Sequence, residues 1–228
     1  MLGPLGFLLI LVSFVATGVA TWLYFGAARQ ERLRDVAVRR ARTAWNVSFA
    51  TLGAASAVLL YLIFTRQFQY NYVYSYTALD LNVFYTFAAF WAGQEGSFLF
   101  WILCVGATGL VLIRKAGSFE APVMALVGLC QLFLVSMVLG LDLGALKLGI
   151  SPFMTLAERY PTEAALQQPG YMPADGAGLN DLLQNPWMVI HPPVLFVGFA
   201  LMLVPFAGGF MAMDGDDSCV AVAYGVYC

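Results

Sequence analysis

Charged residues are scarce in this chain, and their scarcity excludes most soluble folds. Lys, Arg, Asp and Glu make up 11% of the 228 residues, hydrophobic residues make up 61%, and the mean hydropathy is +0.79. A typical soluble domain carries about 25% charged residues. The composition therefore predicts an integral membrane protein. The formal net charge of -2 gives no support to nucleic-acid binding.

Histidine and paired cysteine motifs are nearly absent as well. His191 is the only histidine, and the four cysteines form neither a C-x-x-C nor a C-x-x-C-H spacing. These absences argue against a thiol relay and against covalent haem attachment to this chain. A single histidine cannot form a bis-histidine site. Any histidine-dependent function must therefore rest on His191.

Long uncharged runs are plentiful, and they predict the fold class. A helix that crosses a hydrocarbon core needs about 20 mostly apolar residues. The first run has no basic segment before it and no convincing cleavage site, so it is interpreted as a retained helix. The sequence predicts an all-α membrane bundle of about five transmembrane helices, with an aromatic-rich outer face and one long periplasmic loop. The predicted spans lie near residues 5–26, 44–64, 97–113, 121–141 and 192–213.

Basic residues cluster where they predict the orientation of the spans. Six arginines fall between the first two runs, in what the sequence suggests is a short loop: Arg29, Arg32, Arg34, Arg39, Arg40 and Arg42. Such clusters favour the cytoplasmic side, which makes the N-terminus periplasmic, and Arg114–Lys115 after the third run agrees. A nucleic-acid or anionic-lipid patch is the alternative, but the flanking spans already account for the arginines.

His191 stands directly before the last apolar run. Pro192 and Pro193 follow it, and a residue before proline is pushed out of the α region, whereas proline is accepted in a first helical turn. We therefore expect His191 to cap a helix that starts at Pro192. The helix dipole there favours a neutral imidazole, the form that coordinates metals. The alternative is a histidine that only forms a hydrogen bond near the lipid head groups.

The alternating spans also predict that residues 91–97 and His191 share one side of the membrane. Glycines there permit close backbone approach, a glutamate supplies a carboxylate, and tryptophans supply flat apolar planes. This set suits a planar metal-bearing ligand such as haem, and it also suits a quinone. The alternative is that Glu95 caps its own helix and the tryptophans form an interfacial belt. The predicted haem-facing surface comprises Trp91, Gly93, Glu95, Gly96 and Trp101.

Two segments resemble a known family. Residues 91–101, WAGQEGSFLFW, resemble the W-G-x-x-E-G-S-L-L-L-W segment of CcmF, the haem lyase subunit of bacterial cytochrome c maturation. Residues 179–193, LNDLLQNPWMVIHPP, are similar to that family's L-N-P-L-L-Q-x-P-x-x-x-x-H-P-P. Ala92 and Gln94 depart from the usual glycine and histidine, and Asp181 replaces a usual proline.

The resemblance implies a function in the bacterial inner membrane. It implies a protein that takes haem from a periplasmic haem chaperone and positions it for thioether attachment to apocytochrome c, which a thiol-holding subunit presents. On that basis His191 is expected to be an axial ligand of the haem iron, without an assigned catalytic residue. Membrane lipid is the expected surrounding, and nucleic acid is not an expected partner.

The resemblance covers only about the first third of such a protein. Residues 1–213 are predicted to form its N-terminal membrane module, and residues 214–228 a truncated or frameshifted tail. The tryptophan-rich haem platform and the other histidine ligands of the family are missing, so the fragment alone is expected to be inactive as a haem lyase. A C-terminal haem lyase segment is therefore expected to act beside it as a separate chain.

Two alternatives remain open at this point. The chain could be a membrane scaffold or small transporter subunit without haem, because aromatic belts and uncharged spans explain much of its composition. It could also be a quinone-interacting subunit that uses Glu95.

Overall fold

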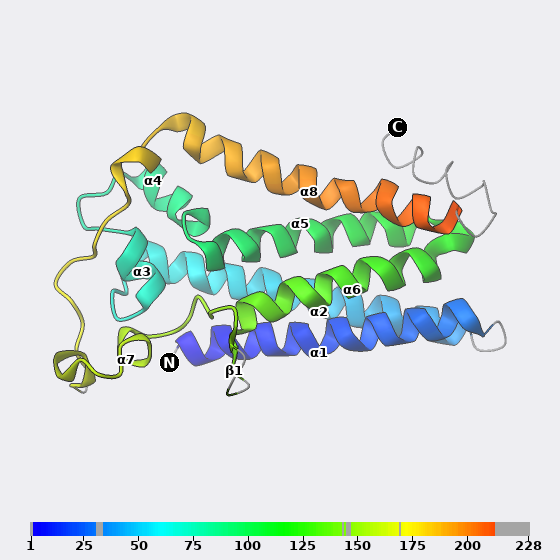
Figure 1. Ribbon diagram of the computed structural model, residues 1–228, viewed down its shortest axis with the longest axis horizontal. Coiled ribbons are helices and arrows are strands. Elements are labelled where there is room, and N and C mark those ends of the chain that lie inside the picture. Colours follow the sequence, from blue (N-terminus) through cyan, green and yellow to red (C-terminus); the bar gives the residue numbers. More distant parts are fainter. Residues whose placement is uncertain (1, 31–33, 143, 145–146, 169, 213–228) are drawn as a thin grey trace. The chain divides into compact units, whose positions relative to one another are not determined.

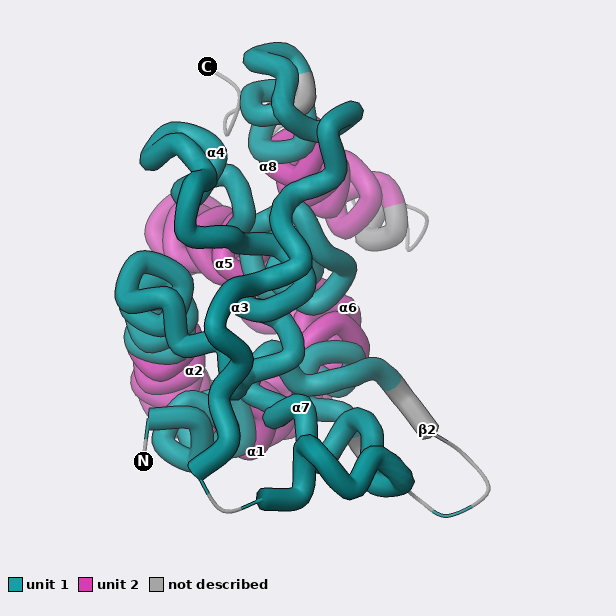
Figure 2. Tube along the Cα trace, turned by 90° about the vertical axis from the view of Figure 1, so that its left-hand side faces the viewer, with its two compact units in different colours: residues 1–11, 53–100, 136–194 teal, residues 12–52, 101–135, 195–228 magenta. Residues whose placement is uncertain are grey.

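The chain forms two compact units. The computed structural model describes residues 2–30, 34–142, 144, 147–168 and 170–212, so the predicted tail 214–228 lies outside the described residues. Unit 1 comprises residues 1–11, 53–100 and 136–194, and unit 2 comprises residues 12–52, 101–135 and the chain from 195 onward (Figure 2). The chain therefore passes between the units five times, once within each long helix.

Five long α-helices dominate the structure (Figure 1), and each is long and apolar enough to cross a membrane. They are α1 Leu2–Arg29, α2 Arg34–Phe64, α5 Gln94–Lys115, α6 Glu120–Leu139 and α8 Pro186–Ala212. In hydrocarbon a helix satisfies every backbone group within its own segment, which is why such apolar runs fold this way. The predicted all-α membrane bundle is confirmed.

The helices extend beyond the apolar runs that predicted them. α2 begins at Arg34 rather than at residue 44, and α5 begins at Gln94 rather than at residue 97. Alanine and arginine are good helix formers whatever their hydropathy, so the helix continues after the hydrocarbon-compatible part has ended. The predicted short arginine loop is therefore wrong in its extent, because four of the six arginines belong to α2. Of the other two, Arg29 ends α1 and Arg32 lies outside the described residues.

Shorter elements connect the long helices. They are α3 Asn71–Tyr76, α4 Val83–Ala88, η2 Ala89–Trp91, η3 Gly117–Phe119, α7 Leu156–Arg159, η4 Ala164–Gln167 and η5 Asp181–Leu183. Strands β1 Leu141–Asp142 and β2 Lys147–Leu148 pair antiparallel, with Leu141 opposite Leu148. This small hairpin follows Gly140, whose φ of 70° lies in the left-handed region that ends helices and favours glycine.

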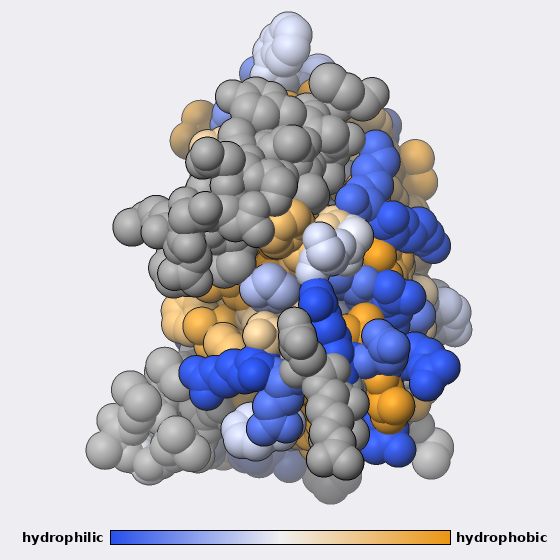
Figure 3. Space-filling model, turned by 90° about the vertical axis from the view of Figure 1, so that its right-hand side faces the viewer, coloured by the Kyte–Doolittle hydropathy of each residue, from blue (hydrophilic) through white to orange (hydrophobic). Residues whose placement is uncertain are grey.

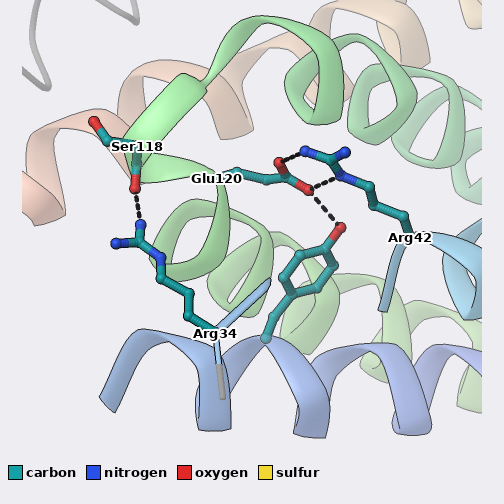
Figure 4. Close-up of polar contacts among 5 residues, drawn as sticks. Arg34, Arg42, Ser118 and Glu120 are labelled. Carbon is teal, nitrogen blue, oxygen red and sulfur yellow. Dashed lines mark hydrogen bonds and ion pairs between the residues drawn. The ribbon is translucent and has the colours of Figure 1, made fainter. Parts of the chain in front are cut away.

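Glu120 joins three helices within unit 2 (Figure 4). The residue is 4% exposed, and its carboxylate accepts hydrogen bonds from the Tyr24 hydroxyl at 3.1 Å and from Arg42 Nε at 2.7 Å. Arg42 also forms an ion pair with it, and Arg34 donates to the Ser118 carbonyl. A buried carboxylate is tolerated when it is paired and hydrogen-bonded in this way. Hydrophilic side chains gather at this end of unit 2 (Figure 3).

α8 begins earlier than the sequence predicted, and His191 does not cap it. The Asn185 side chain accepts a hydrogen bond from the Trp187 N–H at 3.0 Å, and Pro186 occupies the first helical position. Asparagine at the cap followed by proline is a stronger start signal than the two later prolines. His191 therefore lies in the second turn. The dipole effect fades beyond the first turn, so the expectation of a neutral imidazole loses that basis.

Candidate functional site

Tyr72 of α3 holds the turn that leads into α5. Its hydroxyl accepts a hydrogen bond from the Gly93 N–H at 3.1 Å and lies 3.0 Å from the carbonyl oxygens of Ala89 and Phe90, to which it donates. The side chain is 1% exposed, and burial raises the pKa of Tyr72 well above its ordinary value. One hydroxyl therefore satisfies three backbone groups of this turn.

Gly93 and Gly96 are required by the close approach of α3 and η2. A Cβ on Gly93 would lie 2.3 Å from the Tyr76 ring, and one on Gly96 would lie 1.9 Å from the Phe90 carbonyl oxygen and 2.1 Å from the Tyr72 hydroxyl. The predicted tight backbone approach is thus present, but the groups that approach are tyrosines and a carbonyl. A haem-facing role of these two glycines stays a prediction.

Trp91 is enclosed by other aromatic rings. It is 8% exposed, with ring centroids 5.1 Å from Phe87, 6.4 Å from Phe90 and 5.8 Å from Phe100. Its Nε1 is buried without a hydrogen-bond partner in the described part of the chain. The ring contributes to an aromatic core, and the predicted haem-facing role of Trp91 stays a prediction.

Trp101 belongs to unit 2, where it packs against α8. Its ring centroid lies 6.0 Å from that of Phe196 and 5.5 Å from that of Phe199. The side chain therefore contributes to contact between α5 and α8 within that unit. Its predicted place on a haem-facing surface stays a prediction.

Glu95 lines a cavity of about 530 Å³ in unit 1. The cavity lies between the start of α5, the end of α6 and residues 149–161, and His191 is not among the described residues that line it. The Glu95 side chain is partly buried. Burial raises the pKa of Tyr76, and the negative charge of the Glu95 carboxylate raises it further. Glu95 and His191 thus belong to one unit but do not line one cavity, so the structure does not bring the two side chains together in a single pocket.

The segment before α8 is fastened to α3 and to the turn after it. Asp175 accepts a hydrogen bond from the Leu79 N–H at 2.8 Å, and the Ala177 N–H donates to the Tyr74 carbonyl at 2.8 Å. These bonds fix the loop that leads toward the cap of α8.

A second attachment lies directly before that cap. The Tyr85 hydroxyl of α4 donates to the Gln184 carbonyl at 3.0 Å, one residue before Asn185. α3 and α4 therefore form a support on which the start of α8, and with it His191, is held.

His191 is exposed, and its imidazole has no hydrogen-bond partner in the described part of the chain. Trp187 lies four residues before it and Val194 three residues after it, so the three side chains share one face of α8. Trp187 is 76% exposed and Val194 is 65% exposed. This face, which we call the imidazole face (Trp187, His191 and Val194), presents one available nitrogen ligand between apolar groups.

The imidazole face does not form a closed metal site. No cluster of three or more His, Cys, Asp or Glu side chains suited to a metal ion occurs among the described residues. One imidazole with apolar neighbours can instead give a single axial ligand to a planar metal complex, while another molecule or segment supplies the rest.

Sequence reasoning missed the residues that support this face. Tyr72, Tyr85 and Asp175 act through contacts with residues distant in sequence, which the sequence alone does not reveal. The two glycines spaced three residues apart indicate that another group approaches this turn closely, but nothing in the sequence identifies Tyr72 as that group. No comparable signal exists for Tyr85.

Fold and site together define a multi-pass helical membrane protein that presents an exposed histidine in the second turn of its last long helix. Residues 91–216 match the sequence model of the family described as Cytochrome C assembly protein. The chain belongs to this family. The match includes both segments that carried the resemblance, and the predicted family is confirmed.

Individual relatives agree with this assignment. The cytochrome c-type biogenesis protein CcmF of Pseudomonas fluorescens is 32% identical over 214 residues, which cover 94% of this chain and 29% of the relative. CcmF of Escherichia coli K12 is 30% identical over 204 residues, covering 88% of this chain and 28% of the relative. This chain therefore spans less than a third of the length of these relatives.

A solved structure shares the fold. The structure named Cytochrome c Heme Lyase CcmF superimposes with a TM-score of 0.71 at 22% identity, covering 99% of this chain and 34% of that chain. At this level of identity the likeness concerns the fold alone, and it includes all five long helices of the described chain.

Proposed function

We propose that this chain is a haem-handling membrane module of cytochrome c maturation, located in the bacterial inner membrane. The family assignment supports the process, and five apolar helices support the multi-pass membrane location. The scaffold or transporter alternative is not favoured, because the relatives are named for cytochrome c biogenesis.

The distribution of basic residues supports an orientation with the N-terminus on the periplasmic side. Unit 1 contains three Lys or Arg residues: Arg66, Lys147 and Arg159. Unit 2 contains the other eight, including the six arginines around the start of α2. Basic residues accumulate on the cytoplasmic side of membrane proteins. The N-terminus, which belongs to unit 1, would then be periplasmic.

The observation that carries the proposal is the unpartnered imidazole on the imidazole face. Haem is the cargo in this proposal, and its iron accepts an imidazole nitrogen while its ring packs on apolar groups. His191 would supply one axial bond, and Trp187 and Val194 would shield the ring edges from water. The chain contains no second histidine, so the opposite ligand would come from another protein segment.

Partners follow from the same arrangement. A periplasmic haem chaperone would deliver haem to the imidazole face. A thiol-holding subunit would bring apocytochrome c, whose cysteines form the thioether bonds. The second ligand would come from the part of a full-length family protein that this chain does not span.

A haem titration tests the proposal. The full chain, co-purified with the C-terminal segment of a family member, is titrated with haem while the Soret band is followed. His191→Ala should lose the band of ligated haem, and free imidazole should restore it in His191→Gly. Glu163→Gln, an exposed change elsewhere in unit 1, serves as the control and should behave as the parent chain does. An unchanged titration in His191→Ala would remove the proposed ligand.

A further inference from the structure

The cavity beside Glu95 contains polar groups that the proposed haem site does not use. It holds about 530 Å³, within the usual range for small-molecule sites. Its lining combines apolar residues of α5, α6 and the following loop with charged residues of α5 and α7. The lining residues are Gln94, Glu95, Phe98, Met137, Gly140, Gly149, Ile150, Met154, Glu158, Arg159 and Pro161.

Charge in this cavity is unbalanced. Two carboxylates, Glu95 and Glu158, face one guanidinium, Arg159. Glu158 is already engaged in a capping box, accepting from the Thr155 N–H at 2.8 Å. Arg159 attracts the Glu95 carboxylate electrostatically, yet the two are not in ion-pair contact. Within the described residues, the Glu95 side chain therefore has no cationic partner in contact, and burial without one is unfavourable.

A second cavity adjoins the first. It holds about 380 Å³ and shares Gly140, Met154 and Glu158 with it. Its other walls are mostly apolar and include Phe7 of α1 and Phe153. Both cavities lie at the ends of helices that are apolar enough to cross a membrane, so they lie where lipid head groups meet acyl chains.

We propose that the two cavities together bind one phospholipid whose head group carries a primary ammonium. The ammonium lies beside Glu95, the phosphate lies beside Arg159, and part of an acyl chain follows the apolar second cavity. The ammonium supplies the partner that Glu95 lacks, and a charge-assisted hydrogen bond of this kind is short and strong. An anionic ligand is disfavoured, because the lining carries one more carboxylate than cation.

Lipid retention tests this proposal. The full chain is purified from nanodiscs that contain equal amounts of phosphatidylethanolamine and phosphatidylglycerol, and the bound lipid is measured by native mass spectrometry. The parent chain should retain phosphatidylethanolamine in excess. Glu95→Gln removes the charge at nearly constant shape and should lower that excess about tenfold, the value of one charge-assisted hydrogen bond. Glu163→Gln, which makes the same change outside the cavity, should leave it intact.

Other outcomes overturn the proposal. Equal retention of the two lipids by the parent chain, an excess of phosphatidylglycerol, or an unchanged excess in Glu95→Gln would each refute it. Co-purification of a quinone that displaces phospholipid from the chain would do the same. His191→Ala removes the proposed haem ligand and should leave the lipid ratio unchanged, so this proposal and the proposed function fail separately.

Discussion

Replacing Tyr72 with phenylalanine isolates the hydroxyl that supports the turn before α5. The substitution keeps the ring that packs against Tyr76, with centroids 4.9 Å apart, and removes only the oxygen. The Gly93 N–H then loses its acceptor at 3.1 Å, and the Ala89 and Phe90 carbonyls lose their shared donor. These groups are buried, so water replaces the lost bonds poorly.

The magnitude follows from two lost hydrogen bonds. Each contributes a net 0.5–1.5 kcal/mol, and a buried N–H left without a partner adds a desolvation penalty, so we expect a loss of about 2–3 kcal/mol in the free energy of unfolding. The assay is equilibrium unfolding of the full chain in mixed detergent micelles, followed by circular dichroism.

Tyr76→Phe provides the matched control. Tyr76 is less buried, and its hydroxyl has no hydrogen-bond partner among the described residues, so its removal should change stability by less than about 0.5 kcal/mol. The reasoning fails if Tyr72→Phe is no less stable than Tyr76→Phe. Equal losses of stability in the two variants would mean that removing any tyrosine hydroxyl here has the same effect, and that the backbone bonds of Tyr72 add nothing.

Four further substitutions test other contacts of the described structure. Gly96→Ala should lower the free energy of unfolding by more than about 2 kcal/mol, because the added Cβ meets the Phe90 carbonyl oxygen. Gly53→Ala adds a Cβ in open space and should raise the stability slightly. Thermal unfolding distinguishes the two signs. Asp175→Ala should speed amide hydrogen exchange at Leu79, with a stability loss near 1 kcal/mol; unchanged exchange contradicts the assigned bond. Glu120→Gln should lower the free energy of chemical unfolding by about 1–3 kcal/mol. The loss stays moderate because the Arg42 partner is 45% exposed and solvent screens the ion pair. An unchanged stability would refute the structural role of Glu120.

The five spans could be predicted because the bilayer imposes a simple requirement on sequence. Each apolar run of about 20 residues corresponds to one long helix of the structure. The helix ends could not be predicted from the same criterion, as α2 shows. Its first turns contain Arg39 and Arg40, which hydropathy assigns to a loop, although arginine favours helix. Hydropathy indicates which residues can lie in lipid, and residues with high helix propensity continue the helix beyond them.

The start of α8 was misplaced although the necessary signal was present. Asn185 followed by Pro186 is a regular cap and first-turn pair, but the prediction gave more weight to Pro192 and Pro193. Two prolines in a second turn remove two backbone donors that helix interiors normally use. Neighbouring groups make such losses tolerable in membrane helices. A rule based on local conformation therefore placed the boundary six residues late.

The glycines show how far motif reasoning reaches. Gly93 and Gly96 were correctly predicted to permit close approach, because a missing side chain leaves room for something. The identity of the approaching group depends on residues about 20 positions away, and Tyr72 could not be inferred from spacing alone. The sequence therefore predicted the close approach but not the groups that make it, which are the Tyr76 ring at Gly93 and the Phe90 carbonyl and Tyr72 hydroxyl at Gly96. The haem-facing role of the two glycines stays a prediction.

The support beneath His191 combines side-chain and backbone groups. The Tyr85 hydroxyl donates to the Gln184 carbonyl, the Asp175 carboxylate accepts from the Leu79 N–H, and the Ala177 N–H donates to the Tyr74 carbonyl. These bonds hold the chain that leads into α8, and none of them uses the imidazole, which has no hydrogen-bond partner among the described residues. A histidine held by its own hydrogen bonds would have to break them before accepting a metal, and one on a loose loop would lose entropy on binding. The arrangement in unit 1 avoids both costs, because bonds that do not involve the imidazole hold the segment before α8 and the ligand atom remains available.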